Sequence, residues 1–232
     1  MLHFFGDSWP AAGGEIYNYL LKTQGIKTDS YPTMVGKILD MPVKNYAVSG
    51  SSQQHMIIQI LSSNLLPGDH AIFSMTCPAR EMYYNDQNQL VRTMISPNKD
   101  GINDYQDSWR SANVCFMLYH YCKSRQVHPW FINMFTVSSY EKTKHPLWDE
   151  IPEFNWLIPK HECIVQTDFD PAFFNRHADH RNSDYWDWLN DNNAQVQKYI
   201  RPCESHPNLE GKELIAKKIA KEIEKRMKTI SS

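Results

Sequence analysis

The chain has 232 residues, a formal net charge of −2 and a hydrophobic fraction of 41%. This length suits a single domain, 1–232, and the apolar fraction is enough for a sizeable core, which excludes general disorder. With a pI near 6.5, the charge gives no overall field that would attract nucleic acid or an anionic membrane, so neither is expected as a partner.

Short apolar runs alternate with segments of helical spacing along the chain. The run Leu2–Phe5 stops at Gly6, which predicts a buried strand and a tight turn. Further strands are predicted at 43–48, 70–75, 130–135 and 164–167. Helices are predicted at 15–21, 31–39, 53–61, 109–124, 186–200 and 210–228. Three of these helices place apolar residues on one face: Met56, Ile57, Ile60 and Leu61; Val114, Met117, Leu118 and Tyr121; Leu214, Ile215, Ile219 and Ile223.

Two segments lack this alternation of apolar runs and helical spacing, and we expect them to be irregular insertions in the single domain. Residues 81–107, rich in Asn, Asp, Gln and Tyr, predict a long loop, and 136–181 carries scattered prolines and aromatics. Long excursions in compact domains are often functional.

The alternation predicts an α/β fold, a three-layer α/β/α sandwich around a flavodoxin-like, mostly parallel, five-stranded sheet. In such sheets the active site gathers at the carboxyl ends of the strands. Small or polar residues follow each of the first four predicted strands or stand near its end: Gly6-Asp7-Ser8, Ser49-Gly50-Ser51, Thr76-Cys77 and Asn133. We expect these loops to converge.

The beginning of the sequence carries no basic leader, and no segment approaches the roughly 20 apolar residues that cross a bilayer. We therefore expect a soluble, cytoplasmic protein without membrane insertion. The five cysteines are an odd number and form no CxxC pair, which argues against a disulfide framework and against a thiolate zinc site.

A serine directly after a buried strand, in a turn opened by glycine, is held rigidly, and its own N–H faces a developing oxyanion. Ser8 has this place, although Asp7 or Ser8 would also suit a helix cap. A serine nucleophile needs an adjacent base. His206, followed by Pro207 just ahead of the last helix, is the candidate.

These stretches resemble the SGNH/GDSL hydrolase family. Three blocks carry the resemblance: Phe5-Gly6-Asp7-Ser8, residues 45–51, and His206-Pro207-Asn208 with Gly211. The resemblance implies that Ser8 is the nucleophile, that His206 is the general base, and that the backbone N–H groups of Ser8 and Gly50 bind the oxyanion.

The sequence departs from the family in its third block, where an asparagine would supply another oxyanion donor. Residues 74–80 read SMTCPAR instead, so Thr76 or Arg80 is the candidate substitute. The loss of one donor typically costs about 10²–10³ in rate. Residues 101–104 read GIND, but they follow no predicted strand, and we interpret this match as a coincidence.

In the SGNH/GDSL family an aspartate three residues before the histidine completes a catalytic triad of serine, histidine and acid. Cys203 stands at that position here, so the sequence departs from the family pattern at this point too. Glu204 is the residue expected to orient His206. A backbone carbonyl, which would leave a Ser-His dyad, and Asp168 or Asp170 are the alternatives.

No metal and no cofactor is expected. His177, Asp179, His180 and Asp184 lack metal-ligand spacing, and the chain has no glycine-rich phosphate loop. The expected function is a serine esterase acting on a small acyl ester, an O-acetyl group on a carbohydrate, through an acyl-enzyme. Seven tryptophans and twelve tyrosines offer faces for sugar rings, although most should be core. An acyltransferase on the same site and a noncatalytic glycan-binding module are the alternatives.

Overall fold

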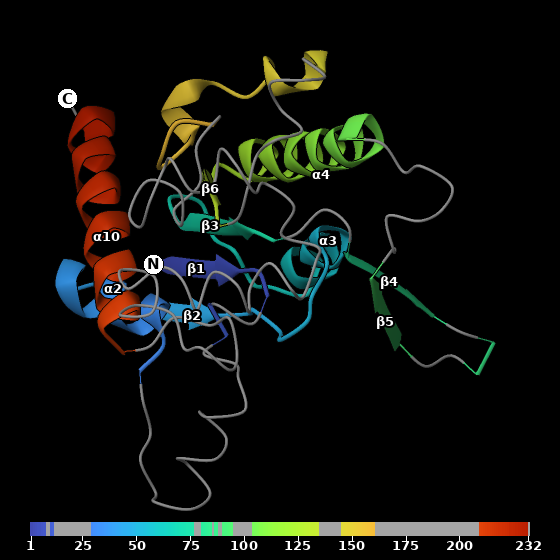
Figure 1. Ribbon diagram of the computed structural model, residues 1–232. Coiled ribbons are helices and arrows are strands. Elements are labelled where there is room, and N and C mark those ends of the chain that lie inside the picture. The colour runs from blue at the N-terminus through green and yellow to red at the C-terminus, as the bar shows by residue number, and fades with distance from the viewer. Residues whose placement is uncertain are drawn as a thin grey trace, which may run out of the picture.

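A computed structural model describes residues 1–7, 10–11, 29–76, 80–84, 86–87, 90–94, 104–134, 145–160 and 209–231. Its centre is a parallel sheet in the order β2-β1-β3-β6 (Figure 1). The strands of this sheet are β1 (Leu2–Phe5), β2 (Val43–Asn45), β3 (His70–Met75) and β6 (His128–Asn133). Leu2 pairs with Val43 on one side and with His70 on the other, so β1 is a central strand.

Helices cover both faces of the sheet, which confirms the predicted three-layer α/β/α sandwich (Figure 1). Helices α2 (Tyr31–Leu39) and α10 (Leu209–Ser231) pack on one face, and α3 (Gln53–Leu61) and α4 (Asp104–Ser124) pack on the other. Side chains alternate along a strand. Accordingly, Phe4 joins the core under α2 and α10, whereas Phe5 joins the core under α3 and α4.

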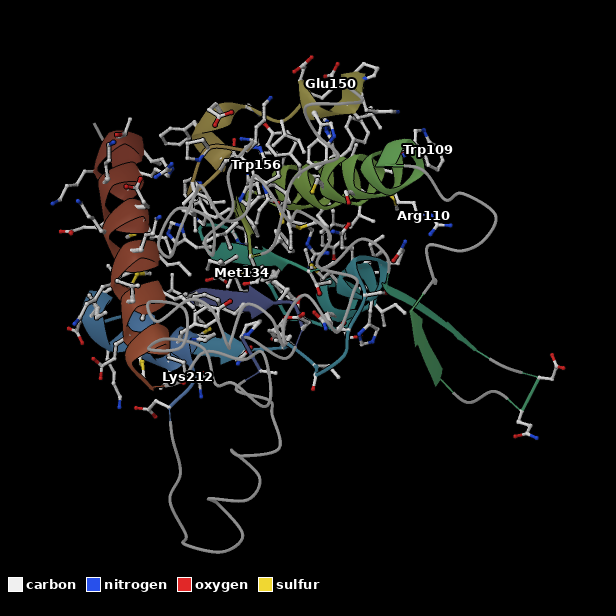
Figure 2. All side chains as sticks on the ribbon, viewed as in Figure 1. Trp109, Arg110, Met134, Glu150, Trp156 and Lys212 are labelled. Carbon is white, nitrogen blue, oxygen red and sulfur yellow. The ribbon has the colours of Figure 1, made fainter. Side chains whose placement is uncertain are left out.

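The predicted number of five strands is wrong for the described sheet, which has four. The outer edge of β6 carries a single parallel bridge instead, between Phe131 and Trp156. The N–H of Leu157 donates to the Phe131 carbonyl at 2.8 Å, and the rings of Phe131 and Trp156 lie 5.3 Å apart. Trp156, labelled in Figure 2, directly follows the short helix η2 (Glu153–Asn155), itself preceded by η1 (Pro146–Trp148). The strand predicted at 164–167 and the helices predicted at 15–21 and 186–200 lie outside the described residues.

The segment 81–107, predicted as a loop, contains regular structure. Strands β4 (Arg80–Tyr84) and β5 (Leu90–Met94) form an antiparallel hairpin, and α4 begins at Asp104 rather than at 109. Tyrosine, valine and threonine favour strands, and the polar residues between the two runs favour a turn. The polar composition of the whole segment obscured this local pattern.

The buried face of α3 differs from the apolar face predicted from its sequence. Gln53 and Gln59 are buried together with Met56 and Ile60, whereas Leu61 is 62% exposed. The apolar residues Met56, Ile57, Ile58, Ile60 and Leu61 cover more than half of the helix circumference, so their spacing alone did not define the buried face.

In α4 the predicted positions Val114 and Leu118 are buried, but Met117 is exposed and Cys115 takes its place in the core. None of the described helices is both long and apolar enough to span a membrane.

Candidate active site

The carboxyl ends of the strands bring the predicted loops together, as expected for a parallel sheet. Strand β1 continues into Gly6 and Asp7, and β3 leads from Ser74 into Thr76; all four residues are buried. The loop that follows β2 stays beside the β1 turn, since the N–H of Val48 donates to the Gly6 carbonyl at 3.1 Å.

Gly6 allows the turn before Ser8 to lie directly against β3. Its φ is +151°, a conformation that L-residues rarely adopt. A Cβ at this position would lie 2.8 Å from Pro10 Cγ and 3.0 Å from both Cβ and the carbonyl oxygen of Ser74. Only glycine fits both the backbone angle and the close approach.

The carboxylate of Asp7 points into the protein and not toward solvent. The Thr76 hydroxyl donates to Asp7 Oδ2 at 2.6 Å, and both side chains are buried. The Thr76 carbonyl accepts a hydrogen bond of 2.7 Å from Gln53 Nε2. Because the Thr76 hydroxyl proton is directed at Asp7, this hydroxyl would have to break that bond before it donated to an oxyanion.

Tyr31 of α2 reaches the same end of the sheet from the opposite face to α3. Its hydroxyl lies 2.5 Å from Ser74 Oγ, and the side chain is fully buried. Burial raises the pKa of the Tyr31 phenol, so this group remains a neutral hydrogen-bonding partner beneath the turn.

The loop after β2 turns sharply at Gly50, whose φ is 74°. The N–H of Ser51 donates to the Val48 carbonyl at 3.0 Å and closes the turn. Ser52 then caps α3 by accepting from the N–H of His55 at 3.2 Å. A tight turn held from both ends gives the Gly50 N–H a defined direction, which an oxyanion donor requires.

The side-chain amide of Gln59 joins this loop to the β1 turn. Its Oε1 accepts from the Gly6 N–H at 3.1 Å, and its Nε2 donates to the Gly6 carbonyl at 3.1 Å. The same Nε2 donates to Ser51 Oγ at 3.1 Å. The Ser51 hydroxyl also lies 2.7 Å from His55 Nδ1.

Solved structures share this arrangement of sheet and helices, whereas comparisons of the sequence itself found no match. No protein-family model matches it. No curated protein matches it either. The YxiM protein of Bacillus subtilis aligns with a TM-score of 0.54 at 15% identity, over 97% of this chain and 56% of that chain. A protein of Desulfitobacterium hafniense DCB-2, described as lipolytic and of the G-D-S-L family, aligns with a TM-score of 0.54 at 12% identity, over 95% of this chain and 98% of that chain.

The chain has the SGNH/GDSL hydrolase fold. This confirms the fold that the short sequence blocks implied. The chain spans little more than half of the Bacillus protein and nearly all of the Desulfitobacterium protein.

Within the SGNH/GDSL fold, two of the predicted site residues are described and lie on neighbouring loops. Gly50 occupies the turn after β2, and Thr76 follows β3. Ser8, His206 and Glu204 lie outside the described residues, and their roles stay predictions. The same holds for Cys203, Asp168, Asp170 and the histidine and aspartate group at 177–184.

Other residues named from the sequence also have defined places. Arg80 is the first residue of β4, and Asp104 of the GIND sequence is the first residue of α4. Asn133, at the end of β6, donates from Nδ2 to the Lys160 carbonyl at 3.0 Å. Within the described ranges, no group of three His, Cys, Asp or Glu residues is arranged to hold a metal ion.

Sequence reasoning missed the glutamines of α3 as members of the site. Gln53 bonds the carbonyl after β3, and Gln59 bonds the turn after β1. The signal available was their spacing, since both fall on the helical face of Met56 and Ile60. A buried polar side chain requires a partner, and the loop ends of the sheet supply it.

Proposed function

We propose that the chain is a serine esterase that hydrolyses a small acyl ester, with Ser8 as nucleophile and His206 as general base. The observation that carries the proposal is the turn at Gly6 and Asp7. It lies at the carboxyl end of a central strand, is anchored to β3 and α3, and stands directly before Ser8 in the sequence. The likeness in fold to one solved protein described as lipolytic supports the same interpretation.

In the proposed reaction His206 removes the proton from the Ser8 hydroxyl, and Ser8 Oγ attacks the acyl carbonyl. The N–H groups of Ser8 and Gly50 stabilise the oxyanion. The intermediate collapses when the ester C–O bond breaks and His206 returns the proton to the leaving alcohol. Water then attacks the acyl-enzyme with His206 as base, and the carboxylic acid leaves.

The remaining parts of the oxyanion hole and triad are proposed as follows. Glu204 orients His206, and Thr76 is the candidate in place of the missing asparagine. Since the Thr76 hydroxyl donates to Asp7, its first contribution is to hold the β1 turn in place. The proposed substrate is an O-acetyl group on a carbohydrate, because aromatic side chains are abundant in the sequence.

The test is covalent labelling with a fluorophosphonate probe, which reacts only with an activated serine. Wild type should be labelled, and Ser8→Ala and His206→Ala should not. Ser62→Ala is the matched control, because Ser62 is exposed and its hydroxyl donates to a helix carbonyl. Acetate release from acetylated sugars then tests the substrate. Wild type that is folded but neither labelled nor able to release acid from any ester would refute the proposal.

The altered third block favours a second candidate, a noncatalytic glycan-binding module. That reading predicts glycan binding unchanged by Ser8→Ala and no labelling. An acyltransferase on the same site would label like an esterase, and it would yield an acylated acceptor when a sugar is added to the assay.

A further inference from the structure

A single side chain of α3 holds both loops that carry the proposed oxyanion donors. Gln59 is 5% exposed, and its amide faces the carboxyl end of β1. It pairs with both backbone groups of Gly6, two residues before Ser8, and with the hydroxyl of Ser51, the residue after Gly50. These three hydrogen bonds connect three separate segments: the turn after β1, the loop after β2 and helix α3.

The pairing of Gln59 with Gly6 uses a donor and an acceptor together. Oε1 accepts from the Gly6 N–H and Nε2 donates to the Gly6 carbonyl, so the orientation of the amide is fixed by its partners. This is the hydrogen-bonding pattern that a neighbouring strand would offer. The Gly6 carbonyl also accepts from the N–H of Val48, and the turn is therefore held from two directions.

The distance between two oxyanion donors matters because each must point at the same developing charge. Gly50 is at a positive φ of 74°, and its neighbour Ser51 is bonded to Gln59 and lies 2.7 Å from His55 Nδ1. A shift of either loop relative to the other would move one donor off the oxyanion. The Gln59 amide is placed to resist that shift.

We infer that Gln59 is a positioning residue that fixes the spacing between the turn before Ser8 and the loop of Gly50. This inference rests on the proposed esterase function. Gln59 touches neither substrate nor the reacting atoms in this role. It acts on the transition state through the two backbone segments that it holds.

The experiment compares Gln59→Met with Gln54→Met on the same helix. Gln59→Met keeps the side-chain length and removes the three hydrogen bonds to Gly6 and Ser51, together with the 3.4 Å contact between Nε2 and His55 Nδ1. Gln54 Oε1 has no hydrogen-bond partner among the described residues, so its replacement is a matched control. The kinetics of p-nitrophenyl acetate hydrolysis are measured below the melting temperature of each variant. Inhibition by phenylboronic acid, which forms a tetrahedral adduct with an activated serine, is measured in parallel.

For Gln59→Met we expect kcat to fall by about 10–100-fold while KM stays within about twofold, since the loss concerns the transition state alone. The inhibition constant of the boronic acid should rise in parallel with the fall in kcat. Gln54→Met should match wild type. Ser51→Ala should lower kcat to a smaller extent, and the double variant should lose less than the product of the two single losses, because both changes break the same link.

Two results would overturn the inference while leaving the esterase intact: a Gln59→Met variant with kcat and boronic acid inhibition like those of wild type, or a loss of rate that follows only the fraction of unfolded protein. A folded wild type that neither hydrolyses esters nor binds the boronic acid would refute the esterase proposal itself. The positioning role would fall with it.

Discussion

The Thr76 hydroxyl donates a 2.6 Å hydrogen bond to the Asp7 carboxylate and so ties the end of β3 to the turn after β1. Neither side chain is accessible to solvent. The two strands already pair in parallel through Phe5 and Phe73. The hydrogen bond extends that connection beyond the sheet, into the segment that leads to Ser8.

Replacing Thr76 by valine should therefore destabilise the protein and slow the proposed reaction. Thr76→Val keeps the shape of the side chain and takes one donor from a buried carboxylate, which costs about 1–3 kcal/mol of the free energy of unfolding. Urea denaturation measures the change. Thr76→Ser retains the hydroxyl and should stay close to wild type, and equal stability of the valine variant and wild type would contradict the role assigned to this bond.

Two glycines with positive φ should respond differently to alanine. Gly68 has a φ of +85°, and no atom lies within 4 Å of the place that a Cβ would take, so Gly68→Ala carries only the backbone cost of about 1–2 kcal/mol. Gly6→Ala adds a clash with Pro10 and Ser74 to a similar backbone cost, and its total should reach about 3 kcal/mol or more. Thermal or urea unfolding of both variants checks the order, and a Gly6→Ala variant as stable as Gly68→Ala would show that the turn can move away from β3.

Acid should destabilise the protein through His70. Burial, together with the nearby His128 and the amino terminus, lowers the pKa of His70 to about 4. The Nδ1 atom also accepts a 3.0 Å hydrogen bond from the Trp130 indole, which requires an unprotonated nitrogen. The unfolded chain, with a pKa near 6.5, binds the proton more tightly. Neutral His70 therefore makes its full contribution to the free energy of unfolding above about pH 6.5. This contribution, about 3 kcal/mol in all, is lost as the pH falls toward 4.

The measurement is the free energy of unfolding as a function of pH for wild type and His70→Asn. The variant loses ring stacking and should be less stable at neutral pH, but its stability should fall less steeply between pH 6.5 and 4. An unchanged slope in His70→Asn would assign the acid sensitivity to other groups.

Cys115 and Cys122 should resist alkylation in the folded protein. Both are buried free thiols. Burial raises the pKa of Cys115 and raises that of Cys122 to about 12, so neither forms the reactive thiolate at about pH 8. Iodoacetamide treatment followed by peptide mass mapping should find both unmodified before, and modified after, unfolding in urea. Rapid modification of either residue in the folded state would show that α4 opens locally.

The sequence predicts the central architecture well, because there the hydrophobic periodicity changes at the same positions as residues that begin or end helices and strands. The bounds of β1, β3, α2 and α3 agree with the structure. Each has a glycine, proline or capping serine next to at least one end: Gly6 after β1, Pro67-Gly68 shortly before β3, and the N-cap residues Ser30 and Ser52 before α2 and α3. The β4–β5 hairpin was missed because its strands are too polar to form a continuous apolar run. Its tyrosines and β-branched residues were the remaining signal.

The site was predictable only in part. Gly50 and Thr76 follow predicted strands, so topology places them at the same sheet edge. The bond between Thr76 and Asp7 depends on side-chain orientation, which residue spacing does not specify. The role of Gln59 could not be predicted for the same reason. A glutamine on a helix is usually exposed, and only the tertiary contact with Gly6 shows which group it bonds.

The central place of β1 also bears on the order in which the molecule assembles. Leu2 has its partners at Val43 and His70, so the first strand has no neighbour close to it in the sequence. Contacts of such long sequence separation form slowly, because a large loop must close before either pairing is gained. The turn that leads to Ser8 would therefore take shape late, after the chain as far as β3 has emerged, and a fragment that ends before His70 should leave its first strand unpaired on one side.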